Sequence, residues 1–224
     1  MGKQEFITQK QFKEADKIFE KYKNNTDIVL NENEYIVVHI DGIKFTSKYL
    51  KNLPNDFKEK VFNVLVDTAI KLCNELKSVK VSYVCSDEIS LLMDGKNIAD
   101  NYNNRIQKIT SIISSIATAT FYKELAELDD KNNVLNELKN RSFFAVKCFN
   151  IPESLVNDYF QVRLMGCKKY IFDCRKNFNE QPDWKKFGAL ITKEEEWRKK
   201  IVDFQAMQLT KTSQKGYFNL VENP

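Results

Sequence analysis

The chain is poor in the residues that build soft-metal and nucleophilic sites. It has one histidine, His39, among 224 residues, and its five cysteines are scattered without a C-x-x-C pair. A histidine-rich metal centre is therefore excluded, and a serine–histidine–aspartate triad could use only His39. Any bound metal must be held mainly by oxygen. The cysteines favour reduced thiols in the core over a disulfide or zinc framework.

Long apolar runs and a strong charge are also missing. No segment reaches the length of a membrane span, and the first residues do not resemble a signal peptide. Lys and Arg number 35 against 31 Asp and Glu, and this small excess does not by itself indicate nucleic-acid binding. Because 42% of the residues are apolar, a core is readily formed. The composition favours a soluble cytoplasmic enzyme.

Two acidic sites interrupt runs that are otherwise apolar. Asp41 follows the run at 35–40, and Asp87-Glu88 separates a run at 79–85 from one at 89–94. Acidic residues are poor strand formers and are costly beside a core. Carboxylates at the tips of neighbouring strands commonly hold divalent cations for phosphoryl or nucleotidyl chemistry. The two sites are therefore the leading candidates for function.

The order of the predicted elements indicates a fold. Strands are predicted at 35–40, 79–85, 89–94 and 142–149, and long helices are predicted from Pro54 to about Leu76 and over about 104–126. This order is strand-helix-strand-strand-helix-strand, the split βαβ arrangement of α+β ferredoxin-like folds, which include polymerase palms. In such a sheet Asp41 can lie beside the hairpin that carries Asp87-Glu88.

The remaining segments are assigned to the periphery of the same domain. An N-terminal helix at about 9–23, a helix at 152–176, a short strand at 187–191 and a helix at 193–205 are predicted. The chain then divides into a lead-in at 1–34, a palm-like core at 35–150, an extension at 151–207 and a polar tail at 208–224. Phe143 and Phe144 are expected in the core.

Three motifs in this order resemble a known family. Residues 39–45 read HIDGIKF, residues 86–90 read SDEIS, and residues 104–111 read NRIQKITS. They are similar to motifs of the tRNA-His guanylyltransferase family, in particular its bacterial-type Thg1-like branch of 3′-to-5′ nucleotide-adding polymerases. The resemblance covers roughly residues 30–192. Departures occur at His39 and Ile43, where the family has arginine, and at Gly166 and Tyr170, where it has an acid and an asparagine.

The resemblance implies a reaction and a metal site. Asp41, the carbonyl of Gly42 and Asp87 would hold two Mg²⁺ ions, with Glu88 supporting the site. The implied reaction is nucleotidyl transfer to the 5′ end of a tRNA, or of another RNA with a 5′-phosphate end, with ATP and GTP as substrates. Family members are commonly oligomers, so a homo-dimer or homo-tetramer is implied as well.

Contacts to nucleotide and RNA are also implied. Arg105 and Lys108 lie on a helix face without acids and would meet the triphosphate. The candidate nucleotide-binding set is Lys44, Phe45, Ser86, Arg105, Lys108 and Ser111. The candidate RNA-binding set is Arg163, Lys168 and Lys169.

Two other functions fit the same residues. A palm-like nucleotide cyclase, or a nucleotidyltransferase with a small acceptor, would keep the metals and release nucleotide products without RNA. A catalytically weak RNA-binding subunit would bind RNA with no metal-dependent turnover. The presence of both Asp41 and Asp87 argues against this last alternative.

Overall fold

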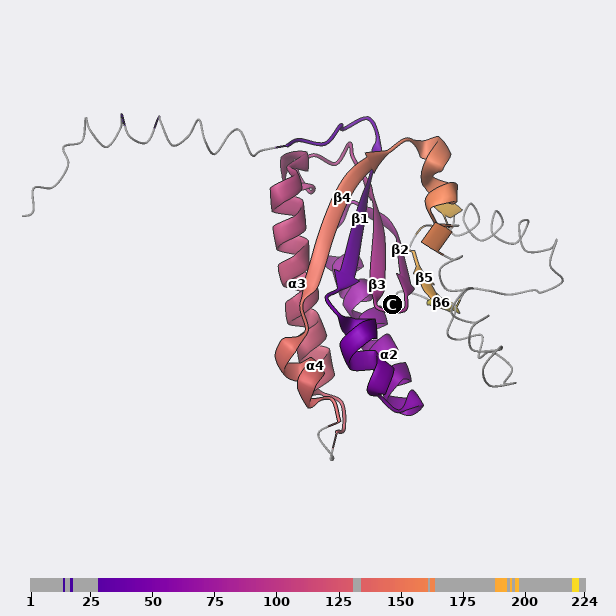
Figure 1. Cartoon of the computed structure of the whole chain (residues 1–224). Coiled ribbons are helices and arrows are strands. Elements are labelled where there is room, and N and C mark those ends of the chain that lie inside the picture. The colour runs from indigo at the N-terminus through magenta and orange to yellow at the C-terminus, as the bar shows by residue number, and fades with distance from the viewer. Residues whose placement is uncertain are drawn as a thin grey trace, which may run out of the picture.

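The computed structural model describes residues 14, 17, 28–130, 134–160, 162–163, 188–192, 194, 196–197 and 219–221. Its main elements are β1 (Tyr35–Gly42), α2 (Asn55–Glu75), β2 (Val79–Cys85), β3 (Glu88–Asp94), α3 (Ile106–Ala126) and β4 (Phe144–Ile151) (Figure 1). Each lies within a few residues of its predicted position. Among the described residues, no helix is long and apolar enough to cross a membrane.

The strands form one six-stranded sheet in the order β4-β1-β3-β2-β5-β6. The pairs β1–β3, β1–β4 and β2–β3 are antiparallel, which is the split βαβ arrangement and confirms the predicted α+β fold. Two short strands, β5 (Ala189–Ile191) and β6 (Asn219–Val221), extend the sheet beyond β2 and pair in parallel. The segment predicted as a polar tail therefore contributes a strand.

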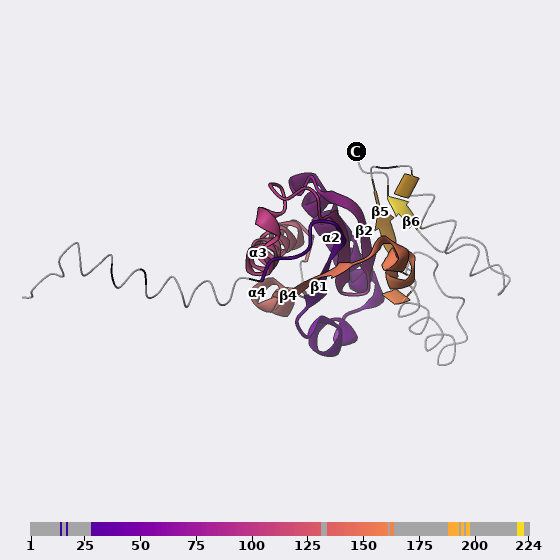
Figure 2. The same ribbon diagram turned by 90° about the horizontal axis from the view of Figure 1, so that it is seen from above.

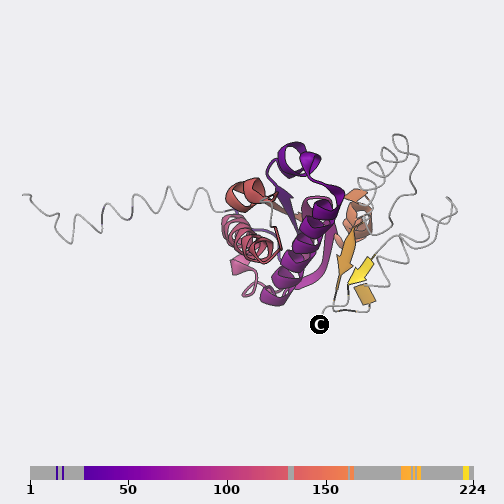
Figure 3. The same ribbon diagram turned by 90° about the horizontal axis from the view of Figure 1, so that it is seen from below.

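Both long helices cover the same face of the sheet (Figure 2). The alternation of β1 turns Ile36, Val38 and Ile40 toward these helices, where all three are fully buried. In α3, apolar residues recur every four residues and all are buried: Ile109, Ile113, Ala117, Phe121 and Leu125. The main core thus lies between the sheet and the α2–α3 layer, seen from the other end in Figure 3.

The face of the sheet that points away from α2 and α3 is here called the outer face. Part of it carries a second apolar cluster that includes Val37, Tyr83 and Leu92, covered by Phe160 and Trp197. The other cluster members are Val81, Cys85, Ile151, Val156 and Leu190. Toward the end of β1 this cover gives way to polar side chains, and the candidate site is found there.

Four short helical segments of the described residues were not predicted, and two of them are the 3-10 turns η2 (Leu50–Asn52) and η3 (Tyr102–Asn104). A turn of π-helix, η1 (Phe45–Tyr49), follows β1, and α4 (Asn136–Arg141) precedes β4. The carboxylate of Asp130 accepts hydrogen bonds from the backbone N–H groups of Val134 (2.7 Å) and Leu135 (3.0 Å) just before α4. Six residues are too few to show a helical period, so a local cap, not the pattern, marks this helix.

The outer helical segments are only partly described. The helix predicted at 152–176 begins as η4 (Glu153–Leu155) and continues in helical conformation through Phe160. Of the helices predicted at 9–23 and 193–205, the structure describes four helical residues, at 14, 17, 196 and 197. The rest of these predicted helices lies outside the described residues.

Candidate active site

The two acidic sites meet at one end of the sheet. In the antiparallel ladder of β1 and β3, Asp41 is the partner of Glu88. The backbone N–H of Gly42 donates a hydrogen bond of 3.1 Å to the carbonyl of Asp87 at the hairpin tip. The predicted adjacency is therefore confirmed, and it follows directly from the pairing of two strands that both end in acids. We call this cluster the strand-end site.

The turn after β1 is built around Gly42 and Phe45. A Cβ atom at Gly42 would lie 2.5 Å from the ring of Phe45, so only glycine lets the ring close over the chain. The Phe45 side chain is fully buried and packs near Tyr49, Phe121 and Phe144, with ring centroids 5.2–6.3 Å apart. Phe45, a predicted nucleotide contact, is thus a core residue that supports the turn from below.

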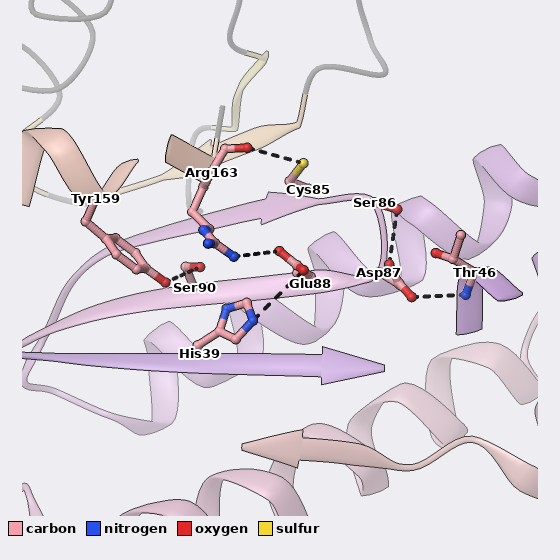
Figure 4. A network of polar contacts seen from close by, with 9 residues as sticks. All are labelled: His39, Thr46, Cys85, Ser86, Asp87, Glu88, Ser90, Tyr159 and Arg163. Atoms are coloured by element: carbon pink, nitrogen blue, oxygen red, sulfur yellow. Dashed lines mark hydrogen bonds and ion pairs between the residues drawn. The ribbon is translucent and has the colours of Figure 1, made fainter. Parts of the chain in front are cut away.

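Three neighbouring groups orient the Asp87 carboxylate or lie beside it. Its Oδ2 accepts a hydrogen bond of 3.0 Å from the backbone N–H of Thr46, and its Oδ1 accepts one of 3.1 Å from the Ser86 hydroxyl (Figure 4). Lys44 is exposed and takes a left-handed conformation (φ 62°) on the same turn. Ser86 and Lys44 therefore both lie on turns at the strand-end site, and their nucleotide-binding role stays a prediction.

Glu88 points to a different set of partners on the outer face. Its Oε2 lies 3.3 Å from Nη1 of Arg163, and its Oε1 lies 4.0 Å from Nε2 of His39 (Figure 4). Arg163 stacks over the ring of Tyr159 at 5.6 Å, and the Tyr159 hydroxyl is hydrogen-bonded to Ser90 Oγ at 2.9 Å. Arg163, predicted to contact RNA, is tied into the site. Lys168 and Lys169 lie outside the described residues.

Tyr159 was not identified from the sequence. It precedes Arg163 by four residues, the spacing at which two side chains share one face of a helix. That spacing is the signal that could have found it. Sequence reasoning also missed the role of Thr46, because a backbone N–H donor leaves no trace in the residue type.

Burial and neighbouring charges shift the pKa values of two residues at the strand-end site, Asp41 and His39. Burial raises the pKa of Asp41 above its ordinary value, and the carboxylates of Asp87 and Glu88 raise it further. Burial lowers the pKa of His39, an effect that Glu88 opposes and Arg163 reinforces. The ionisation of Asp41 is thus penalised by burial and by two nearby carboxylates, a pattern typical of functional sites.

This arrangement fits a hard divalent cation with few protein ligands. Across the described ranges, no group of three or more His, Cys, Asp and Glu side chains is placed to hold a metal by itself. Mg²⁺ is commonly bound by one or two carboxylates, with water and substrate phosphates completing its shell. The repulsion that Asp41 feels from Asp87 and Glu88 is what such a cation would relieve.

The start of α3 is not part of this site. Arg105 forms a bridge with Val29, and the N–H of Ile106 donates to the carbonyl of Ile28 (3.0 Å), before β1 begins. The Ile106 carbonyl lies 3.9 Å from Cys148 Sγ, and Cys148 is the β4 partner of Val38 in the middle of β1. In addition, α3 covers the opposite face of the sheet (Figure 1).

Of the predicted triphosphate contacts, three therefore lie away from the carboxylates within one chain. Lys108 and Ser111 are exposed in the first and second turns of α3, and the Ser111 hydroxyl donates to the Lys108 carbonyl at 3.2 Å. The structure does not bring Arg105, Lys108 or Ser111 to the strand-end site. Their nucleotide-binding role stays a prediction.

One cysteine departs from expectation. Cys85, which precedes the hairpin tip, is disulfide-bonded, whereas all five cysteines were expected to be reduced. Scattered spacing excludes a C-x-x-C motif but not a bridge between cysteines far apart in sequence. Cys73 and Cys148 are free, and burial raises the pKa of the Cys148 thiol to about 11.

Comparison with known proteins identifies relatives over most of the chain. The family model for tRNAHis guanylyltransferase matches residues 14–152. A bacterial tRNA(His) guanylyltransferase (Thg1)-like protein in complex with GTP has a similar structure, with a TM-score of 0.67 and 27% identity over 81% of this chain and 85% of that one. A complex of such a bacterial protein with ATP gives 0.62 and 27% over 80% and 84%.

A more distant structure agrees in fold. The tRNA(His) guanylyltransferase of Saccharomyces cerevisiae gives a TM-score of 0.57 with 22% identity over 84% of this chain and 82% of that one. A comparison with curated proteins found no significant sequence match. The solved structures and the family model therefore point to the same relatives.

Proposed function

The chain belongs to the tRNAHis guanylyltransferase family of nucleotidyltransferases, and we propose that it adds nucleotides in the 3′-to-5′ direction to the 5′ end of a tRNA. One observation carries the proposal most: Asp41 and the Asp87-Glu88 tip come from separate motifs and meet at one strand end. Nucleotidyl transfer uses carboxylates gathered at one place, and in this chain they meet where β1 ends and β3 begins.

Within this proposal each acidic residue has its own task. Asp41, the carbonyl of Gly42 and Asp87 would hold Mg²⁺, which supplies charge neutralisation and in-line orientation of the reacting phosphate when bound. Asp87 enters with its carboxylate already oriented by Thr46 and Ser86. Glu88, paired with Arg163, supports the site from the outer face.

Nucleoside triphosphates are the proposed co-substrates. The bacterial relatives are described as complexes with GTP and with ATP. Lys44 is exposed beside Asp41, and Ser86 is exposed at the hairpin tip, so both would meet phosphate oxygens there. Arg105, Lys108 and Ser111 would reach the same phosphates only from a second copy of the chain, which agrees with the implied homo-oligomer.

The test is incorporation of labelled nucleotides into a tRNA that lacks its 5′-terminal nucleotide. The tRNA is offered with 5′-monophosphate and 5′-triphosphate ends, Mg²⁺ and all four triphosphates. We expect metal-dependent extension at the 5′ end, reduced on the order of a thousand-fold by Asp41→Asn or Asp87→Asn. The matched control is Asp67→Asn, the same change on α2, which should retain full activity.

Two results would overturn the proposal. Consumption of triphosphates without extension of the RNA would indicate a nucleotide cyclase or a transferase with a small acceptor. RNA binding without any consumption of triphosphate would indicate a catalytically weak binding subunit.

A further inference from the structure

We propose that the outer face of β4 is a stacking platform for unpaired RNA nucleotides beside the strand-end site. Four residues at every second position make up this surface, Phe143, Ala145, Lys147 and Phe149, and we call it the β4 platform. The proposal rests on the proposed function for the identity of the RNA, an unpaired strand next to the 5′ end that receives the nucleotide.

All four platform residues are exposed. The Phe143 side chain is 54% exposed and that of Phe149 is 39% exposed, while Ala145 and Lys147 between them are also exposed. Phe143 was expected in the core together with Phe144, and the expectation is wrong for Phe143. Phe144 faces the helices and is buried, so strand alternation turns Phe143 to the outer face.

The platform is continuous with the strand-end site. In the β1–β4 ladder, Ala145 is the partner of Asp41 and Lys147 is the partner of His39. The N–H of Ile43 donates to the carbonyl of Phe143 at 2.9 Å and extends the ladder by one pair. Burial and the neighbouring carboxylates raise the pKa of Asp41, and the Lys147 ammonium opposes part of that rise.

Proteins that bind single-stranded nucleic acid commonly use exposed aromatic rings and nearby cationic side chains, and the β4 platform has both. Bases stack on aromatic side chains, and a lysine meets the phosphate backbone. Phe149 is held in place by an edge-to-face contact with Tyr159 at 6.1 Å. Phe143 and Phe149 are six residues apart, about 20 Å along the strand, which leaves room for more than one base.

Charge favours RNA over an apolar protein partner. No acidic residue belongs to the platform, and Lys44 and Lys48 are exposed on the turn that follows Ile43. The Lys48 ammonium lies over the Tyr49 ring at 5.1 Å. A polyanion lying along β4 would therefore have a cation in the platform and further cations beyond its Phe143 end.

The test measures binding of a labelled single-stranded RNA hexanucleotide to the full chain, without triphosphate or Mg²⁺. We expect Phe143→Ala and Phe143→Leu to weaken binding roughly ten-fold and Phe143→Trp to retain it, because stacking needs a ring. Ile98→Ala, which trims an exposed apolar residue outside the platform, is the control and should bind normally. Lys147→Ala should reduce the slope of log K against log salt by about 0.7.

Several outcomes would overturn the platform. They are wild-type binding by Phe143→Ala, wild-type binding by Phe143→Leu, equal affinity for a duplex of the same sequence, or no binding by the wild type. Wild-type binding by Phe143→Leu would indicate a plain apolar surface of the kind that a protein partner covers.

The same variants separate this proposal from the proposed function. If RNA binds through Phe143 but no nucleotide is added, the function fails and the platform stands. If nucleotides are added and Phe143→Ala leaves the KM for RNA unchanged, the platform fails and the function stands.

Discussion

The strand-end site and the start of α3 were predicted to contact the same triphosphate, but in the structure they lie on opposite faces of the sheet. Asp41, Asp87 and Glu88 meet because two neighbouring strands end together. Arg105 and Lys108 lie at the start of α3, which packs on the other face of the sheet. The register of paired strands fixes which residues of the two strands are neighbours. The residues of a helix are close to one another, but their contacts with other elements depend on how the helix packs.

The largest expected effect tests whether the second region serves another copy of the chain. Asp87→Asn and Lys108→Ala each remove one region, and we expect both variants alone to lose most 5′ addition. When the two variants are mixed and allowed to exchange subunits, an intact α3 meets an intact strand-end site, so activity should return to roughly a quarter of wild type.

Nucleotide incorporation before and after mixing is the measurement. If the activity of the mixture equals only the sum of the two separate activities, the site is not shared between two copies of the chain. Full activity of Lys108→Ala would show that α3 is not used at all. A mixture of Asp41→Asn with Asp87→Asn is the control, because both changes fall in the same region and should complement less.

An intermediate effect concerns how tightly the strand-end site is packed. Gly42→Ala places a methyl group 2.5 Å from the buried Phe45 ring, so the ring or the turn must move. Overpacking of this kind costs about 1–3 kcal/mol, which for a chain of this length lowers Tm by roughly 2–12 °C. Thermal unfolding followed by circular dichroism measures it.

A compensating change makes that prediction sharper. Phe45→Leu in the Gly42→Ala background removes the ring and should recover part of the lost Tm, although Phe45→Leu alone destabilises the wild type. If the double variant loses more Tm than the two single variants lose together, the clash between the methyl group introduced at position 42 and the Phe45 ring is not the cause of the destabilisation.

The smallest effect concerns the repulsion among the carboxylates. The folded-state pKa of Asp41 lies above its ordinary value of 3.8, so the ionised group costs stability at neutral pH. This cost disappears as the pH falls through the raised pKa. We expect Asp41→Asn to raise Tm at pH 7 by no more than about 3 °C, because solvent screens a partly exposed charge. The difference should shrink near pH 4.

Added Mg²⁺ should stabilise the wild type more than it stabilises Asp41→Asn. At ten times its dissociation constant it would stabilise the wild type by about 1.4 kcal/mol, and Asp41→Asn by much less. Asp67→Asn should respond to Mg²⁺ as the wild type does. Equal stabilisation of wild type and Asp41→Asn, or a lower Tm for Asp41→Asn at pH 7, would show that Asp41 is not at a cation site.

Much of the fold follows from local pattern. The strands and long helices lie close to their predicted positions because their apolar periods of two and of 3.6 residues are long and regular. The strand-end site was predictable for the same reason, since acids directly after such strands come together once the sheet forms. The cap that starts α4 and the strand β6 are too short to show a period, and they were missed.

The sequence by itself determined the split βαβ order and the place of Asp41, Asp87 and Glu88 at strand ends. Only the tertiary structure decided that Arg163 reaches Glu88, that Phe45 is buried while Phe143 is exposed, and that α3 packs on the face opposite the carboxylates. Local sequence sets which residues share a face or a tip, because backbone geometry repeats every few residues. Which face is covered, and which distant charge becomes a partner, depends on contacts between segments that no local period records.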